Sequence, residues 1–79
     1  MNKTFCGIRF DTCTVGERLK ELRAEKGIGQ NKLARDLDLS NASISYWENG
    51  LQEPGAAALF KLARYFGVSA DYILGLSDY

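Results

Sequence analysis

The sequence contains no histidine and only two cysteines, Cys6 and Cys13. Two thiols without a histidine, and without Cys-x-x-Cys spacing, are too few ligands for a zinc site, so we expect no metal. A cysteine nucleophile would lack a histidine base, and no glycine-rich phosphate loop or nucleophile elbow is present. The sequence therefore argues against an enzyme and indicates no cofactor or small-molecule ligand. Both thiols are expected to be reduced, as is usual in the cytosol.

Long apolar runs are also missing. No segment approaches the length needed to cross a membrane, and Arg9 and Asp11 interrupt the only apolar patch near the N-terminus. We therefore expect neither a signal peptide nor a membrane span, and a cytoplasmic location. With 79 residues, of which 46% are hydrophobic, the chain has the size and composition of one small globular domain.

A surplus of positive charge is the third feature that the sequence lacks, since ten basic residues balance ten acidic ones. Between Gly16 and Val68, eight cations face seven acids. Proteins that bind nucleic acids usually carry a basic surplus, because contacts to phosphates supply much of their affinity. Composition alone does not indicate DNA binding.

The sequence does contain a regular series of helix start and stop signals. Thr14 and Glu17 have capping-box spacing, which predicts a first helix from Val15 that ends at Gly27. Four more helices are expected, over about 30–37, from the N-cap Ser40 to Gly50, from Gly55 or Ala56 to Gly67, and from the N-cap Ser69 to Gly75. Their apolar residues recur at helical spacing. The prediction is an all-α domain over 15–75, with an N-terminal arm (1–14) and a tail (76–79).

The arm carries Phe5, Ile8 and Phe10. Three states stay open for it: a short strand, packing onto the helices, or frayed disorder.

The helix after Ser40 separates into two faces at about 100° per residue. Ile44, Trp47 and Glu48 share one side, where the first two are expected in the core. The opposite arc is small and polar and carries Asn41, Ala42, Ser45, Tyr46 and Asn49, with Ser43 at its edge. Such side chains suit contacts to base edges in DNA, although a solvated helix face has a similar composition.

Glu48 is a carboxylate on the apolar side of this helix and needs a cationic partner there. Arg23, at the edge of the apolar stripe of the first helix, is the natural candidate. A partly buried pair between the two would fix the geometry of the two helices.

Two long runs, GERLKELRAEKGIGQNKLARDLDLSNASISYWENG and EPGAAALFKLARYFGVSADYILG, resemble the Cro/phage-repressor (XRE-like) helix-turn-helix family. The resemblance covers about Val15 to Gly75. It implies a five-helix lambda-repressor-like DNA-binding domain that acts as a homodimer on a near-palindromic operator. It also assigns base contacts to Ser40, Asn41, Ala42, Ser45 and Tyr46, phosphate contacts to Gln30, Ser43 and Asn49, and an internal ion pair to Arg23 and Glu48.

The chain departs from the family pattern at four places. Asp38 stands where a glycine is usual, and it must therefore adopt a left-handed conformation. Gly29 and Gly55 replace the usual Ser or Thr caps of the second and fourth helices, at a cost of a few tenths of a kcal/mol each. The exposed arc of the third helix has no Arg or Lys for a guanine contact.

The function we expect is sequence-specific binding of double-stranded DNA by a small transcriptional repressor. The last helix, with Tyr72, Ile73 and Leu74, is the expected dimer surface, and the alternative for these residues is simple closure of the core. The competing function is a protein-interaction module on the same scaffold, such as an antitoxin-like or anti-repressor partner, in which Tyr46 and the arm would contact another protein.

Overall fold

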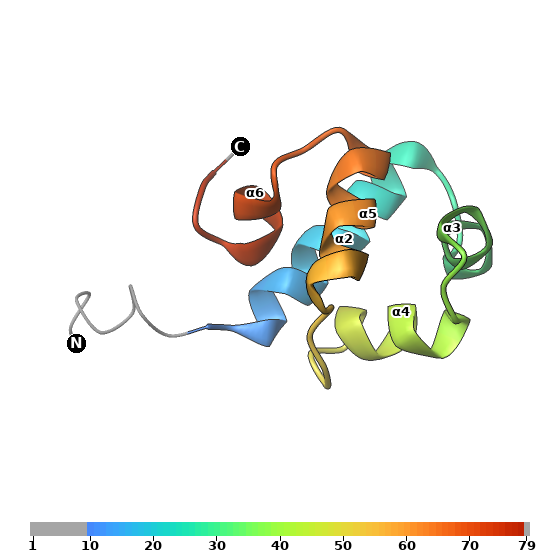
Figure 1. Ribbon diagram of the computed structural model, residues 1–79, viewed down its shortest axis with the longest axis horizontal. Coiled ribbons are helices and arrows are strands. Elements are labelled where there is room, and N and C mark those ends of the chain that lie inside the picture. Colours follow the sequence, from blue (N-terminus) through green and yellow to red (C-terminus); the bar gives the residue numbers. More distant parts are fainter. Residues whose placement is uncertain (1–9, 79) are drawn as a thin grey trace.

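The computed structural model describes residues 10–78, and this part of the chain is all-α. Within it lie five helices: α2 (Thr12–Lys26), α3 (Gln30–Leu37), α4 (Asn41–Glu48), α5 (Ala56–Phe66) and α6 (Ala70–Leu74) (Figure 1). The expected number, order and type of elements are therefore confirmed for these residues. Cys6, Phe5 and Ile8 lie outside the described residues, whereas Phe10 is described and about half exposed.

The first helix begins at Thr12, three residues before the Val15 start that the sequence predicts, and the segment ahead of it is correspondingly shorter. Asp11, rather than Thr14, is the N-cap of α2: its carboxylate accepts a hydrogen bond of 2.9 Å from the backbone N–H of Cys13. Asp caps a helix better than Thr does, because its charged oxygen also meets the positive end of the helix dipole. Thr12 is then free to donate from its hydroxyl to the carbonyl of Gly50, 3.0 Å away.

A tight turn joins α3 to α4. Asp38 ends α3 in the left-handed conformation (φ 57°, ψ 48°) that the sequence requires of it. Its backbone N–H bonds to carbonyls of the last turn of α3, which satisfies groups that the helix end leaves open. Ser40 then caps α4 by accepting a hydrogen bond of 3.0 Å from the backbone N–H of Ser43.

The remaining helices begin and end where the sequence predicts. Gly55 precedes α5 without a side-chain cap, and Gly67 ends that helix with φ 69°. Ser69 caps α6 through the backbone N–H of Tyr72, and Gly75 follows its last residue with φ 89°. Positive φ values of this size cost little for glycine, which has no Cβ.

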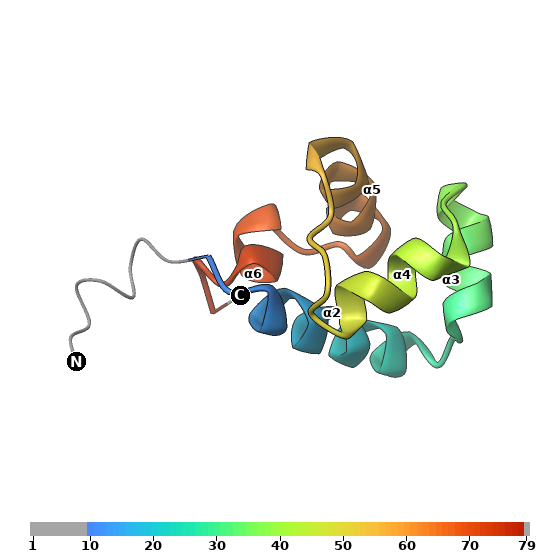
Figure 2. The same cartoon turned by 90° about the horizontal axis from the view of Figure 1, so that it is seen from below.

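The helices enclose one core, with α2 at its centre. This helix packs against α4 on one side and α6 on another, while α5 contacts α3 and α6. The side chains with no exposed surface come from all five helices and are Val15, Leu19, Leu33, Ile44, Leu62 and Ile73. In Figure 1, α4 lies along the lower edge of the molecule, and no other described helix lies below it. Figure 2 shows the same helix from below, beside α2.

The position of Ile73 corrects part of the predicted dimer surface. Its side chain is fully buried within a single chain, so it closes the core and is not available to a partner. Tyr72 and Leu74, its neighbours in α6, are only partly buried. A five-residue helix has room for one fully inward-facing position, and Ile73 occupies it.

Candidate nucleic-acid interface

The buried carboxylate of Glu48 joins three parts of the chain. Its side chain is 1% exposed and lies 2.8 Å from Arg23, measured from Oε2 to Nε. Arg23 donates a second bond, of 3.0 Å, from Nη2 to Oε1, which makes the pair bidentate. Gln30, the first residue of α3, donates from Nε2 to Oε1 at 2.9 Å. The structure thus brings Arg23 and Glu48 together and adds Gln30, and we call these three residues the clamp.

Arg23 also reaches the loop between α2 and α3. Its Nη1 donates to the carbonyl of Ile28, 3.0 Å away. The hydrogen bonding of Arg23 to the Glu48 carboxylate, reinforced by the charge of that carboxylate, raises the pKa of Arg23 above its ordinary value, although burial acts in the opposite direction. The guanidinium therefore stays charged, and the clamp holds α2, the start of α3 and the end of α4 in one arrangement.

A glycine inside α2 lets the backbones of α2 and α4 approach each other closely. A Cβ added to Gly16 would lie 2.6 Å from the carbonyl oxygen of Glu48 and 2.7 Å from that of Trp47. Real Cβ atoms do not come this close to backbone oxygens, so only glycine fits here. This contact was not predicted from the sequence, although a glycine within an apolar helical stripe is itself a signal of close packing.

The outer face of α4 is exposed and electrically neutral. Asn41, Ala42 and Asn49 are exposed, Tyr46 is 44% exposed, and the inward side holds Ile44, Trp47 and Glu48. The only charge of this helix is therefore the paired carboxylate of Glu48. These side chains offer hydrogen-bond donors, acceptors and an aromatic ring to a neighbouring surface, without a cation.

Some of the polar side chains on this face of α4 are held by hydrogen bonds to one another. The Ser40 hydroxyl donates to Ser43 Oγ at 2.9 Å, and Asn49 donates from Nδ2 to Ser45 Oγ at 3.3 Å. Asn41 makes no side-chain hydrogen bond to any described residue. Its amide carries both a donor and an acceptor, which is the set needed to bind the edge of an adenine.

The first turn of α3 lies next to the clamp and is open. Gly29 provides no side-chain cap, no acidic residue lies in the first turn, and a Cβ added to Gly29 would meet no atom within 4 Å. The first backbone N–H groups of a helix have no partner within the helix, and they carry the positive end of its dipole.

The end of the chain that carries α6 is held by Arg18. This residue of α2 donates from Nη1 to the carbonyls of Tyr72 and Ser77, and its guanidinium lies 4.3 Å from the centre of the Tyr72 ring. Tyr72 is therefore partly engaged within its own chain. Exposed apolar surface nearby comes from Leu76 in the C-terminal tail.

Within residues 10–78, no group of three or more metal-ligating side chains lies close together. In the same residues, no helix is long and apolar enough to span a membrane. Cys13 is exposed and forms no disulfide with a described residue.

Comparison with known proteins places this geometry in a family. Residues 19–73 match the family model described as "Helix-turn-helix". The chain is 37% identical over 65 residues to the HTH-type transcriptional regulator ImmR of Bacillus subtilis (strain 168), an alignment that covers 82% of this chain and 51% of ImmR.

Solved structures share the same fold. A crystal structure of the P22 c2 repressor in complex with a synthetic operator superposes with a TM-score of 0.75 and 33% identity, and the match covers 80% of this chain and 96% of that one. The restriction-modification controller protein C.AhdI from Aeromonas hydrophila gives a TM-score of 0.72 at 27% identity, with coverage of 78% and 94%. The chain spans about half the length of the first curated relatives that it matches.

Proposed function

This chain belongs to the helix-turn-helix family, and on that premise we propose that it is a small transcriptional repressor that binds double-stranded DNA at a specific sequence. It would act in the cytoplasm as a homodimer on a near-palindromic operator. Helix α4 would lie in the major groove, and two subunits would read half-sites about one helical turn apart.

The single observation that best supports this proposal is the exposed face of α4. The clamp and the close approach at Gly16 fix this helix from behind, and its outer side chains stay uncovered by any described element. A helix that reads bases must be held rigidly, because misplacement by a fraction of an ångström breaks hydrogen bonds. We assign base contacts to Ser40, Asn41, Ala42, Ser45 and Tyr46.

Contacts to DNA phosphates would lie on both sides of the base-contacting helix α4. We assign them to Gln30, Ser43 and Asn49. The uncapped N-terminus of α3 supports the first of these, since its open N–H groups favour an anion. Gln30 donates one amide hydrogen to Glu48 and keeps a second for a phosphate oxygen.

Dimerisation is proposed through the end of the molecule that carries α6. Tyr72 and Leu74 are partly exposed there, and Leu76 adds an apolar side chain that is 70% exposed. An isologous contact of this end would relate two α4 helices by a two-fold axis. A matching two-fold axis in the operator follows from that symmetry.

A protein-interaction module is the second candidate, and the neutral face of α4 is the observation that favours it. Affinity for DNA depends largely on cations, and α4 has none on its surface. In that case Tyr46 would be the centre of a protein contact, since exposed aromatic residues are frequent anchors of interfaces.

Selection from a pool of randomised duplex DNA, at low and at moderate salt, tests the proposal. The expected result is enrichment of one dyad-symmetric site, bound more weakly at the higher salt concentration. The control is a variant with Asn41, Ser45 and Tyr46 all changed to Ala, which keeps the fold and should enrich no site. Failure of the natural chain to enrich any sequence at low salt would reject specific DNA binding and favour the interaction module.

A further inference from the structure

The C-terminal end of α4 carries a pair of residues with a chemistry of its own. Asparagine is among the thermolabile residues of proteins. The chain has four asparagines, and only Asn49 is followed by a glycine, Gly50. Glycine has no Cβ, so its backbone nitrogen is less shielded than that of any other residue. Asn49 is also exposed. This pair is therefore where a backbone nitrogen can approach the side-chain amide of an asparagine with least hindrance.

Deamidation of this pair needs only the two residues and water. The backbone nitrogen of Gly50 loses its proton to solvent and attacks Cγ of Asn49. A C–N bond forms, the bond from Cγ to Nδ2 breaks, and Nδ2 takes up a proton and leaves as ammonia. Water then opens the cyclic imide at either of its two carbonyl carbons. One opening gives aspartate, and the other gives isoaspartate, in which the main chain runs through Cβ and Cγ.

The native backbone keeps the reacting atoms apart. Asn49 has φ −94° and ψ 4°, so the Gly50 nitrogen is nearly eclipsed with the backbone nitrogen of Asn49 rather than with its Cβ. The N–H of Gly50 donates to the carbonyl of Trp47 at 3.2 Å, and Asn49 donates from Nδ2 to Ser45 Oγ at 3.3 Å. Closure of the imide ring therefore requires rotation about ψ of Asn49 and loss of both hydrogen bonds.

That rotation displaces only the chain that follows α4. The clamp fixes Glu48, the last residue of α4, so the helix is held up to the residue before Asn49. The next residues beyond the pair, 51–53, are exposed. One hydrogen bond of 3.0 Å, from Thr12 Oγ1 to the carbonyl of Gly50, ties this segment to α2. A helix end with exposed neighbours opens at a small free-energy cost.

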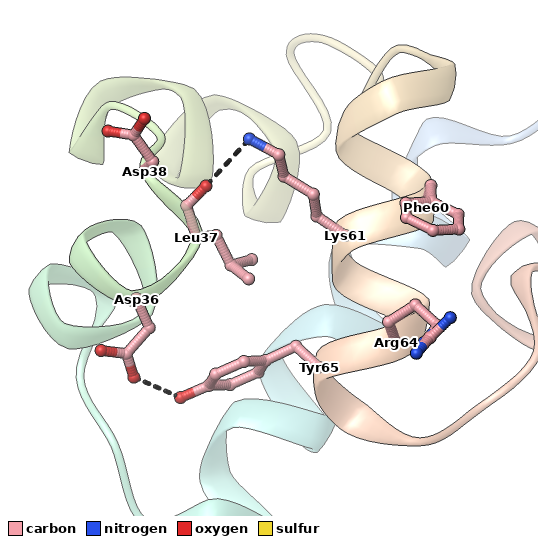
Figure 3. A pocket seen from close by; sticks show the side chains of 7 residues that line it. All are labelled: Asp36, Leu37, Asp38, Phe60, Lys61, Arg64 and Tyr65. Atoms are coloured by element: carbon pink, nitrogen blue, oxygen red, sulfur yellow. Dashed lines mark hydrogen bonds between the residues drawn. The ribbon is translucent and has the colours of Figure 1, made fainter.

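The other end of α4 is held more firmly. Figure 3 shows two hydrogen bonds that join α3 to α5, from Lys61 Nζ to the carbonyl of Leu37 (3.1 Å) and from the Tyr65 hydroxyl to Asp36 Oδ2 (2.6 Å). Asp36 is also paired with Lys32 at 3.1 Å. Because α4 begins directly after the turn at this bridged end of α3, opening is confined to its C-terminal end.

We propose that Asn49 is a site of spontaneous deamidation, and that the bond from Thr12 to Gly50 sets its rate by limiting how often the chain after α4 opens. The product carries a carboxylate where the natural residue carries an amide. A negative charge at the C-terminal end of a helix opposes the helix dipole. Isoaspartate also adds a main-chain atom before Gly50 and displaces its carbonyl from Thr12. The modified form accumulates with the age of the protein.

The consequence for DNA binding rests on the proposed function, in which Asn49 contacts a phosphate. The Asn49 amide can donate a hydrogen bond to a phosphate oxygen, whereas a carboxylate only accepts. The carboxylate also carries the same charge as the phosphate, so the modified chain binds DNA more weakly. Helix α4 has no cation that could offset the new charge. Deamidation thus limits the time over which one molecule can occupy its operator.

Peptide mapping by mass spectrometry tests the modification without DNA. The full chain is kept at mildly alkaline pH, which favours loss of the backbone proton, and sampled over time. Asn49 should acquire the mass change from NH2 to OH, while Asn31 and Asn41, which are also exposed, keep their amides over the same period. An Asn49 amide that persists as long as those of Asn31 and Asn41 would overturn the proposal.

A variant of Thr12 tests what controls the rate. Thr12→Val removes the hydroxyl that bonds to Gly50 and should raise the rate at Asn49 about fivefold, the change in the opening equilibrium expected from one lost hydrogen bond. Thr14→Val is the matched control, since its hydroxyl bonds to Asp11, and it should leave the rate unchanged. Circular dichroism verifies that both variants are folded. Equal rates in Thr12→Val and the natural chain would contradict control by this bond.

Fluorescence anisotropy with the selected DNA site measures the consequence. The deamidated fraction, separated by anion exchange, should bind about tenfold more weakly than the unmodified chain, since a donor to phosphate is replaced by a like charge. Asn49→Gln is the control: it keeps an amide but closes only a larger ring, so the same incubation should change neither its mass nor its affinity. Equal affinities of the two fractions would overturn the link to DNA binding. A chain that selects no DNA site would reject the proposed function, while the mass spectra would still decide the modification.

Discussion

At the scale of single residues, Glu48 shows how a buried charge can fix the relative orientation of two helices. Among residues 10–78 it is the only buried charged residue, and three hydrogen bonds satisfy its carboxylate. A buried ion pair adds little net stability compared with an apolar pair, because desolvation offsets the attraction. Its effect is on arrangement: the bidentate contact with Arg23 allows one orientation of α4 relative to α2.

Replacing Glu48 by Ala should destabilise the protein strongly. The change leaves Arg23 partly buried without its partner, which costs about 3–5 kcal/mol of unfolding free energy. Urea unfolding followed by circular dichroism measures this difference. Glu25→Ala, at an exposed position of the same helix as Arg23, is the control and should change stability by less than about 0.5 kcal/mol. Equal unfolding midpoints for the two variants would show that the pair contributes nothing.

The sequence was sufficient to predict Arg23 and Glu48 as partners, because a helical wheel places one at the edge of an apolar stripe and the other within one. It was not sufficient to predict Gln30 as the third member of the clamp. Glutamine at the start of a helix carries no burial signal, and its contact depends on how α3 is positioned in space. Ile73 was equally ambiguous, since core closure and an exposed apolar face give the same pattern in a five-residue helix.

At the scale of secondary-structure elements, glycine and capping residues determine where the helices begin and end. Gly27, Gly67 and Gly75 end their helices with left-handed backbone, as the sequence predicts. The one misplaced boundary, at the start of α2, arose because two capping signals compete there: Thr14 with its capping box, and Asp11. The long-range bond from Thr12 to Gly50 favours the earlier start, and no local pattern reveals that bond.

The N-terminus of α3 offers a way to separate stability from DNA binding. Gly29→Asp adds a capping carboxylate at a position with ordinary φ (−89°) and open space, so the unfolding free energy should rise by a few tenths of a kcal/mol. The same carboxylate occupies the N–H groups and repels phosphate, so affinity for the selected DNA site should fall. Gly29→Asn is the neutral control, with a similar cap and a smaller loss of affinity. Equal losses for both variants, measured by fluorescence anisotropy, would contradict a phosphate contact here.

The close contact between α2 and α4 at Gly16 should make a larger side chain at that position destabilising. Gly16→Ala pushes a methyl group into the backbone carbonyls of Trp47 and Glu48 and should cost about 1–3 kcal/mol. The better helix propensity of alanine offsets up to about 1 kcal/mol of that cost. Thermal unfolding measures the balance. A variant as stable as the natural chain would show that the two helices separate at no cost.

At the scale of the whole molecule, one hydrogen bond links the stability of the fold to pH. Tyr65 in α5 donates to Asp36 in α3. This hydrogen bond is the largest cause of a lowered pKa at Asp36, and the contact with Lys32 lowers that pKa further. The same bond raises the pKa of Tyr65. A lowered carboxyl pKa stabilises the fold above about pH 4, the ordinary value for Asp, and this contribution is lost as pH falls through the lowered pKa. A raised phenol pKa stabilises it below about pH 10 and is lost as pH rises through the raised pKa.

Tyr65→Phe should therefore reduce stability by a constant amount between about pH 5 and pH 9, and the difference from the natural chain should shrink toward both extremes. Urea unfolding at a series of pH values measures it. Tyr46→Phe, which removes a hydroxyl from the exposed face of α4, is the control and should show no such profile. A difference that grows at high pH would contradict the assigned direction for Tyr65.

If the neutral outer face of α4 reads bases, removing one of its side chains must change which bases the protein prefers. Binding free energies are determined for the selected site and for each of its single base-pair variants, with the natural chain and with Asn41→Ala. We expect Asn41→Ala to lose about 1–3 kcal/mol per bidentate contact on the selected site, and to lose discrimination at one position of each half-site. Unchanged discrimination at every position would contradict it.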